Sequence, residues 1–256
     1  MGPASVLMVG FAAAAASAAV FNLWLHVVRG RGTLHLWLGV AALGVTGMTF
    51  GTAGVYEART LAGSQQAQLA TLACACVLVL GFLRFTALFT GARMRLFETL
   101  ALGYVLVVTA AALLDPSWFF SGRLTEGRAT WLGQEFVEAE LSGAAQALFP
   151  GHLAILAGLF VVYWRHRHRI TRPAPVLVAV ALWCLCGVND IAVAARVYEA
   201  PYLMTLGWSG FVIAFTGLLL RRFVESMVQV ESSAGALQRL VEERTEELRR
   251  KDLQLA

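Results

Sequence analysis

Asp190 is the side chain with the clearest capacity for chemistry, because it interrupts an apolar run and follows another polar residue, Asn189. An ionisable group at membrane depth is costly unless it meets a partner or water, so this position is a candidate functional site. A ligand held there would be cationic or hydroxyl-bearing, or the carboxyl group would titrate as a proton sensor. The alternative is that Asn189 and Asp190 bond neighbouring helices and serve packing alone.

Five further side chains fall at a depth comparable with that of Asp190 if the apolar runs are membrane-spanning helices. They supply a phenol, a carboxylate, an amide, an imidazole and an indole, which together could line a polar pocket that opens outward. The predicted ligand-binding residues are Asp190, Asn189, Tyr56, Glu57, Gln68, His152 and Trp208. The sequence predicts no catalytic residues and no metal site.

The elements that must position these residues follow from the composition. Hydrophobic residues form 58% of the 256 residues, charged residues form 14%, and the mean hydropathy is +0.68, which a water-soluble domain could not carry on its surface. Apolar runs long enough to cross a bilayer recur along the chain. We therefore expect an all-α, seven-helix transmembrane bundle over residues 1–222, with spans at 4–28, 33–56, 67–90, 96–114, 148–164, 174–195 and 202–220.

The distribution of arginine predicts the orientation of this bundle. Arginines concentrate after the first, third, fifth and seventh runs, so the positive-inside rule places the N-terminus outside and the C-terminus in the cytoplasm of a bacterial inner membrane. Residues 115–147 then form an outside loop, in which TWLGQEFVEAELSGAAQAL has the spacing of an interfacial helix. Its aromatic residues would anchor that helix at the headgroups, or the helix would act as a lid.

Several other polar or small residues have structural interpretations. Arg84 is expected to extend to the cytoplasmic headgroups, whereas Asn22, His26 and His35 could form a polar seam. Gly44, Gly47, Gly51 and Gly54 would allow close helix contact. The cysteines Cys74, Cys76, Cys184 and Cys186 are interpreted as small packing residues rather than as disulfides or metal ligands.

Residues 223–256 differ sharply in composition but keep an apolar heptad. One seam position contains Met227, Ala234, Val241, Leu248 and Leu255, and the other contains Phe223, Val230, Leu237, Arg244 and Lys251. The register continues from the last apolar run, so it predicts a cytoplasmic coiled-coil linker that joins two copies of the chain and carries movement of the last helix. The alternative is an amphipathic helix lying on the membrane.

The tail sequence LQRLVEERTEELRRKDLQLA resembles the linker that precedes the PAS or dimerisation domain of bacterial sensor histidine kinases, through Val241, Arg244, Thr245, Glu247 and Leu248. The stretch that ends in PYLMTLGWSGFVIAFTGLLLRRFVES is similar to the last two helices of the seven-helix sensor modules of such kinases, notably at PYL, Gly207, Trp208 and RRF. This resemblance implies a two-component signalling receptor that acts through a histidine kinase domain and a response regulator. The kinase itself is not in these residues, so we expect a piece of a longer receptor or a stand-alone receptor with a partner.

The sequence also distinguishes a sensor from two other classes of membrane protein, retinal receptors and transporters. A retinal receptor needs a lysine in its last membrane helix, and the lysine of this sequence is Lys251 in the tail, so no cofactor is predicted. A transporter would show broken helices or inverted repeats and would not need the heptad. The predicted function is a sensor of a small, lipidic or membrane-borne signal, with a diguanylate cyclase or phosphatase as alternative outputs. Its expected partners are membrane lipids, a second copy of the chain and an unknown small ligand, not nucleic acid.

Overall fold

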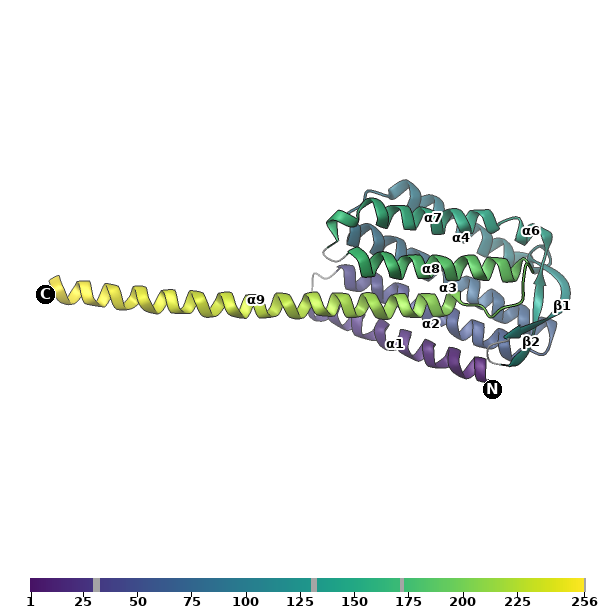
Figure 1. The fold of residues 1–256 in the computed structure, drawn as a ribbon, viewed down its shortest axis with the longest axis horizontal. Helices are drawn as coiled ribbons and strands as arrows, with labels where there is room; N and C mark the ends of the chain where they lie inside the picture. The colour runs from purple at the N-terminus through teal and green to yellow at the C-terminus, as the bar shows by residue number, and fades with distance from the viewer. Residues whose placement is uncertain (30–32, 130–132, 171–172, 256) are drawn as a thin grey trace. The chain divides into compact units, whose positions relative to one another are not determined.

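The computed structural model describes residues 1–29, 33–129, 133–170 and 173–255, and these form two compact units, Met1–Ala214 and Phe215–Ala256. The first unit is a helix bundle with a two-stranded hairpin (Figure 1). Its main helices are α1 (Pro3–Arg29), α2 (Thr33–Glu57), α3 (Leu61–Thr90), α4 (Arg95–Leu114), α7 (Phe149–Arg165) and α8 (Pro173–Ala194). The short elements are α5 (Pro116–Phe119), α6 (Gly143–Gln146) and the 3-10 turn η2 (Arg167–Arg169).

Six helices within the described residues are long and apolar enough to cross a membrane. They begin and end close to the first six predicted spans, because long apolar runs fix both the length and the type of the element. The last helix, α9 (Met204–Leu255), starts in the first unit and makes up most of the second. The chain is therefore a multi-pass helical membrane protein.

Close packing of α2 against α3 depends on glycine, as the glycine spacing of α2 predicted. A Cβ on Gly44 would collide with the backbone of Leu78, and a Cβ on Gly81 would lie 2.5 Å from the Ala41 nitrogen. Both neighbours are backbone atoms, which cannot move without separating the helices. These two contacts let the two backbones approach to a distance that a side chain would prevent.

Replacing Gly81 with alanine is therefore expected to destabilise the protein by about 1–3 kcal/mol through overpacking. The measurement is the free energy of unfolding in detergent micelles. Gly103→Ala is the matched control, because a Cβ on Gly103 in α4 meets no atom within 4 Å. An equal stability of the two variants would contradict this account of the α2–α3 contact.

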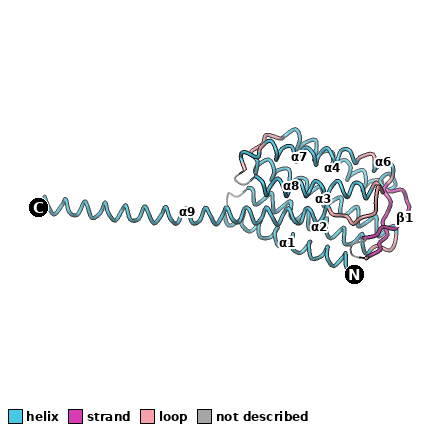
Figure 2. The backbone as a smooth tube through the Cα atoms, viewed as in Figure 1, coloured by secondary structure: helices cyan, strands magenta, loops and turns pink. Residues whose placement is uncertain are grey.

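A β-hairpin lies across one end of the bundle, which we call the hairpin end (Figure 2). Strand β1 (Phe120–Ala129) pairs antiparallel with β2 (Gln134–Leu141). The interfacial helix predicted for this loop is therefore wrong. Residues Glu138 to Leu141 alternate polar and apolar side chains, a period of two that suits a strand, and Trp131, one of its expected anchors, lies outside the described residues.

The hairpin also explains why α3 begins earlier than predicted. The Thr60 side chain caps α3 by accepting a hydrogen bond from the Gly63 nitrogen, so the helix includes six residues before Ala67. Ser64 Oγ accepts from the Ala139 nitrogen of β2 at 2.8 Å. The Gln68 amide donates to the Ala139 oxygen at 3.1 Å. These polar residues bind the free edge of β2 rather than forming a loop.

Gln134 joins the hairpin to the ends of two helices. Its Oε1 accepts from the Ala4 nitrogen of α1 at 2.8 Å, and its Nε2 donates to the Tyr56 oxygen of α2 at 3.2 Å. Both bonds are buried, and each one satisfies a backbone group at a helix end. The hairpin is therefore part of the bundle and not an appended loop.

Three of the polar residues discussed from sequence have defined partners. Arg84 of α3 forms an ion pair with Glu98 in the first turn of α4 at 2.9 Å, with the Arg84 side chain half exposed. Asn22 Oδ1 and His35 Nδ1 are 3.0 Å apart, which confirms contact between these two members of the expected polar seam. Both pairs join neighbouring helices.

Candidate ligand cavity

A cavity of about 370 Å³ lies inside the first unit, between α2, α3, α7, α8 and the first turns of α9. Residues of the hairpin, Glu138 and Leu141, also line it. Most of its wall is apolar, and its volume falls in the range of small-molecule sites. The cavity is therefore a candidate site for a largely apolar ligand.

Aromatic side chains from three helices form one wall of the cavity. Phe82 of α3 contacts Trp183 of α8 edge-on at 5.2 Å and Trp208 of α9 at 4.7 Å between ring centroids. Trp183 and Trp208 are 4.5 Å apart. These three buried rings touch one another, so a molecule that presses on one of them acts on the first turns of α9 as well.

The polar lining of the cavity gathers residues from several elements. Gln68 comes from α3, His152 from α7, Asp190 from α8, Glu138 from β2 and Tyr202 from the segment before α9. No lysine or arginine of the described residues lines the cavity. The site is apolar over most of its surface and acidic in its charged groups.

Asp190 caps helix α9 from the neighbouring helix. Its Oδ1 accepts from the Leu203 nitrogen at 2.6 Å, and its Oδ2 accepts from the Met204 nitrogen at 3.0 Å. The first amides of a helix have no partner within the helix, and its N-terminus favours a negative charge. Asp190 therefore connects the end of α8 to the start of α9.

Asn189 fixes the segment between these two helices. Its amide donates to the Pro201 oxygen at 3.0 Å, and its Oδ1 accepts from the Tyr198 hydroxyl at 2.6 Å. It is not among the residues that line the cavity. Asn189 thus supports the geometry of Asp190 from outside the cavity.

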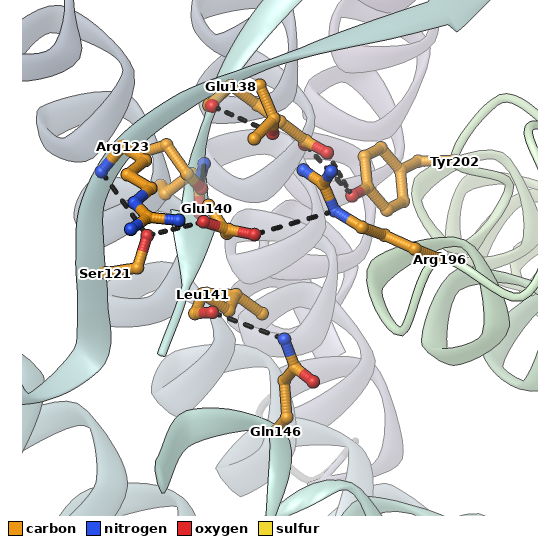
Figure 3. Close-up of polar contacts among 11 residues, drawn as sticks. Ser121, Arg123, Glu138, Glu140, Leu141, Gln146, Arg196 and Tyr202 are labelled. Carbon is orange, nitrogen blue, oxygen red and sulfur yellow. Dashed lines mark hydrogen bonds and ion pairs between the residues drawn. The ribbon is translucent and has the colours of Figure 1, made fainter. Parts of the chain in front are cut away.

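Glu138 holds the hairpin against the segment before α9. The Tyr202 hydroxyl lies 3.1 and 3.0 Å from the two carboxylate oxygens of Glu138 (Figure 3). Burial raises the pKa of the Glu138 carboxyl above its ordinary value, although the Tyr202 hydrogen bond and Arg196 oppose this change. Burial and the nearby Glu138 carboxylate raise the pKa of Tyr202 well above its usual value.

A second contact joins the same two segments. Glu140 of β2 lies 3.9 Å from Arg196 and accepts a hydrogen bond of 2.8 Å from Ser121 of β1 (Figure 3). Arg196 has a φ of 58°, a left-handed conformation that is uncommon for a residue other than glycine. The hairpin and the α8–α9 segment are therefore held together by two neighbouring carboxylates of one strand.

The environment of His152 defines its tautomer. The Tyr104 hydroxyl donates its one proton to the Leu148 oxygen at 2.6 Å, and His152 Nδ1 lies 3.0 Å from the same hydroxyl. The hydroxyl oxygen can then only accept from the imidazole, so Nδ1 carries the proton. In the neutral ring, Nε2 is left as an acceptor.

The structure places four of the predicted site residues on the cavity, namely Gln68, His152, Asp190 and Trp208. Tyr56 and Glu57 lie elsewhere at the hairpin end. The Tyr56 ring packs edge-on against Phe136 at 4.8 Å, and Glu57 Oε1 accepts from the Gly2 nitrogen and the Ser5 hydroxyl at 2.6 Å each. Glu57 is thus a cap for α1.

Sequence reasoning missed Glu138 and Tyr202 as cavity residues. Glu138 falls within the predicted outside helix, and Tyr202 falls in the PYL element at the start of the predicted seventh span. The signal in the sequence was the alternating EAEL segment, whose strand brings every second side chain to one face. A strand that folds back over the bundle places its acidic residues beside the ends of the helices.

The second unit exposes the apolar seam of the predicted coiled coil. Met227, Val230, Leu237 and Val241 are between 47% and 63% exposed. Ala234 and Arg244 are also exposed, and Phe223 is half-buried. Leu248 belongs to α9, but its side chain lies outside the described ones, as do those of Lys251 and Leu255. Arg221 and Glu225 form an ion pair one turn apart at 2.9 Å.

The fold and the cavity define the class of this chain as a multi-pass helical membrane protein with a cavity that is lined in part by the first turns of its last helix. No protein-family model matches the sequence, and no curated protein is significantly similar to it. Its function has to be argued from the site itself.

Proposed function

We propose that this chain is the sensor module of a membrane receptor, which binds a small, lipidic or membrane-borne molecule in the cavity and transmits binding through α9. The observation that carries the proposal is the capping of α9 by a cavity residue, Asp190. Met204, Thr205 and Trp208 of α9 also line the cavity. A ligand would thus contact the start of the helix and the group that holds it.

The proposed receptor crosses the membrane seven times. Residues 204–220 carry no charged side chain and are about as long as the shortest spans, so we propose the first part of α9 as the seventh span. An odd number of spans agrees with the arginine distribution, which puts the hairpin outside and the tail in the cytoplasm. A bacterial inner membrane is the proposed location.

The proposed receptor is a dimer joined through its tail. An exposed heptad stripe of Met227, Val230, Leu237 and Val241 needs a partner to leave water, and a second copy supplies an identical stripe. The similarity of the tail to kinase linkers favours a histidine kinase domain and a response regulator as the output. A diguanylate cyclase or a phosphatase would use the same linker geometry.

Insertions of one to seven residues after Ser226 test this transmission. The chain is fused to a histidine kinase reporter, and phosphorylation of its response regulator is measured. Each inserted residue rotates the downstream part of the helix by about 100°, so the output should vary with insertion length and return at seven residues, which restore the heptad. Seven inserted residues are the matched control for lengthening alone. Output that does not depend on insertion length would contradict transmission by helix register.

A further inference from the structure

The charged groups on the cavity wall are all acidic. Of the described residues that line it, Glu138 and Asp190 carry carboxylates, and none carries an ammonium or guanidinium group. Arg196, whose charge acts on Glu138, pairs with Glu140 and does not line the cavity. A ligand therefore meets negative charge that no lysine or arginine among the described residues of the wall balances.

Most of the unused hydrogen-bonding capacity of the polar side chains on the wall is that of acceptors. Both oxygens of Glu138 face a single Tyr202 proton, so at least one oxygen retains its acceptor capacity. His152 Nε2 is an acceptor in the tautomer that Tyr104 imposes. The amide NH₂ of Gln68 donates to Ser64 and Ala139, so its carbonyl oxygen remains available as an acceptor. Trp183 contributes one donor, because its buried Nε1–H has no hydrogen-bond partner within the described residues. The groups beside the two carboxylates are acceptors, so a ligand head group bound there must supply donors.

We propose that the cavity binds an apolar molecule with a protonated amine as its head group, held by Glu138 and Asp190. This proposal rests on the proposed function, because it names the ligand class of the same cavity. The apolar body lies among the rings of Phe82, Trp183 and Trp208, whose faces also favour a cation. An amine supplies positive charge and up to three donors in one compact group, which an alcohol supplies only in part.

A carboxylate head group is excluded by the same reasoning. It would place a third negative charge beside two partly buried carboxylates, with no lysine or arginine among the described lining residues to offset it. An alcohol of equal length gains the apolar contacts and one donated hydrogen bond. The expected order of affinity is therefore amine, then alcohol, then carboxylate.

The test uses three probes of equal chain length, which are n-octylamine, n-octanol and n-octanoate. Each is titrated into the full chain in detergent micelles, and the indole NMR signals of Trp183 and Trp208 report occupancy of the cavity. The signals are assigned by W183F and W208F. We expect octylamine to bind at least about tenfold more tightly than octanol, a difference of about 1.4 kcal/mol. Octanoate should leave both signals unchanged.

Two variants link this preference to the carboxylate. E138Q should weaken octylamine binding about tenfold and change octanol binding less than twofold, because only the cation loses its charged partner. E126Q removes an exposed carboxylate of the same hairpin and should bind as the unmodified chain does. A circular dichroism melting curve of each variant shows that the bundle is folded during the titration.

The outcomes separate the ligand class from the proposed function. Equal affinity for the three probes, or octylamine binding that E138Q leaves unchanged, overturns the amine proposal and leaves the sensor function standing. Octylamine binding with the expected preference, but no change of output in the kinase fusion at saturating octylamine, contradicts the proposed function and supports the ligand class. A tenfold preference that E138Q removes, together with a changed output, supports both.

Discussion

Asp190→Ala is expected to lower the free energy of unfolding by about 2–5 kcal/mol, because it removes the acceptor of two amides at the start of α9. A backbone N–H left without a partner in an apolar bundle cannot form a hydrogen bond with water instead, so each of the two amides lowers the free energy of unfolding. Hydrogen exchange at Leu203 and Met204 should also increase. Asp190→Asn keeps one acceptor oxygen and should lose about half as much.

Asp115→Ala is the matched control for this variant. Asp115 also caps a helix, since it accepts from the Ser117 nitrogen at 3.0 Å, but it is exposed and its helix has four residues. Water can replace this cap, so its removal should cost about 1 kcal/mol or less. If Asp190→Ala were no more destabilising than Asp115→Ala, α9 would not depend on Asp190.

The contribution of Glu138 to the stability of the protein is expected to decrease as the pH rises above 4.5, the ordinary pKa of a glutamate, because the pKa of Glu138 is raised in the folded state. Between 4.5 and the raised value the folded state binds more protons than the unfolded chain, so deprotonation favours unfolding. One such group contributes a slope of at most about 1.4 kcal/mol per pH unit. The contribution is complete at low pH and is lost as the pH passes the folded-state pKa.

The comparison that isolates this effect is between the unmodified chain and Glu138→Gln. The free energy of unfolding is measured across pH 4 to 8 — roughly the range that spans ordinary and raised carboxyl pKa values — and the difference between the two proteins is plotted. The variant lacks the titrating group, so the unmodified chain should lose stability relative to it as the pH rises. Parallel curves would show that Glu138 does not change its protonation on folding.

The helices of the bundle could be predicted from sequence, and the hairpin could not. Apolar runs of about 20 residues admit one interpretation in a membrane protein. In the hairpin segment, Phe136, Val137 and Leu141 fit helical spacing, while Glu138 to Leu141 alternate as a strand does. The segment is a strand because it pairs with β1 and bonds to Ser64 and Gln68 of α3. These contacts join residues that are distant in sequence.

The candidate site was predicted in part for a similar reason. Distance along a span gives the depth of a residue, and depth grouped Gln68, His152, Asp190 and Trp208 correctly on one cavity. Depth does not give the direction around the helix axis. Glu57 shares the hairpin end but turns toward Gly2 and Ser5 of the first helix. Such directions follow from packing, which a single sequence does not record.

If the state of the cavity reaches the tail, a side chain that fills the cavity should change the distance between the two tails of a dimer. Ala75→Phe places a ring in the cavity, whereas Ala70→Phe adds the same ring to an exposed position of α3. A spin label at S233C, in a background without the native cysteines, reports the separation of two tails by pulsed electron resonance in lipid nanodiscs. We predict a defined separation in the unmodified chain and in Ala70→Phe, and a shifted separation in Ala75→Phe. No defined separation, or one that Ala75→Phe leaves unchanged, would contradict the account.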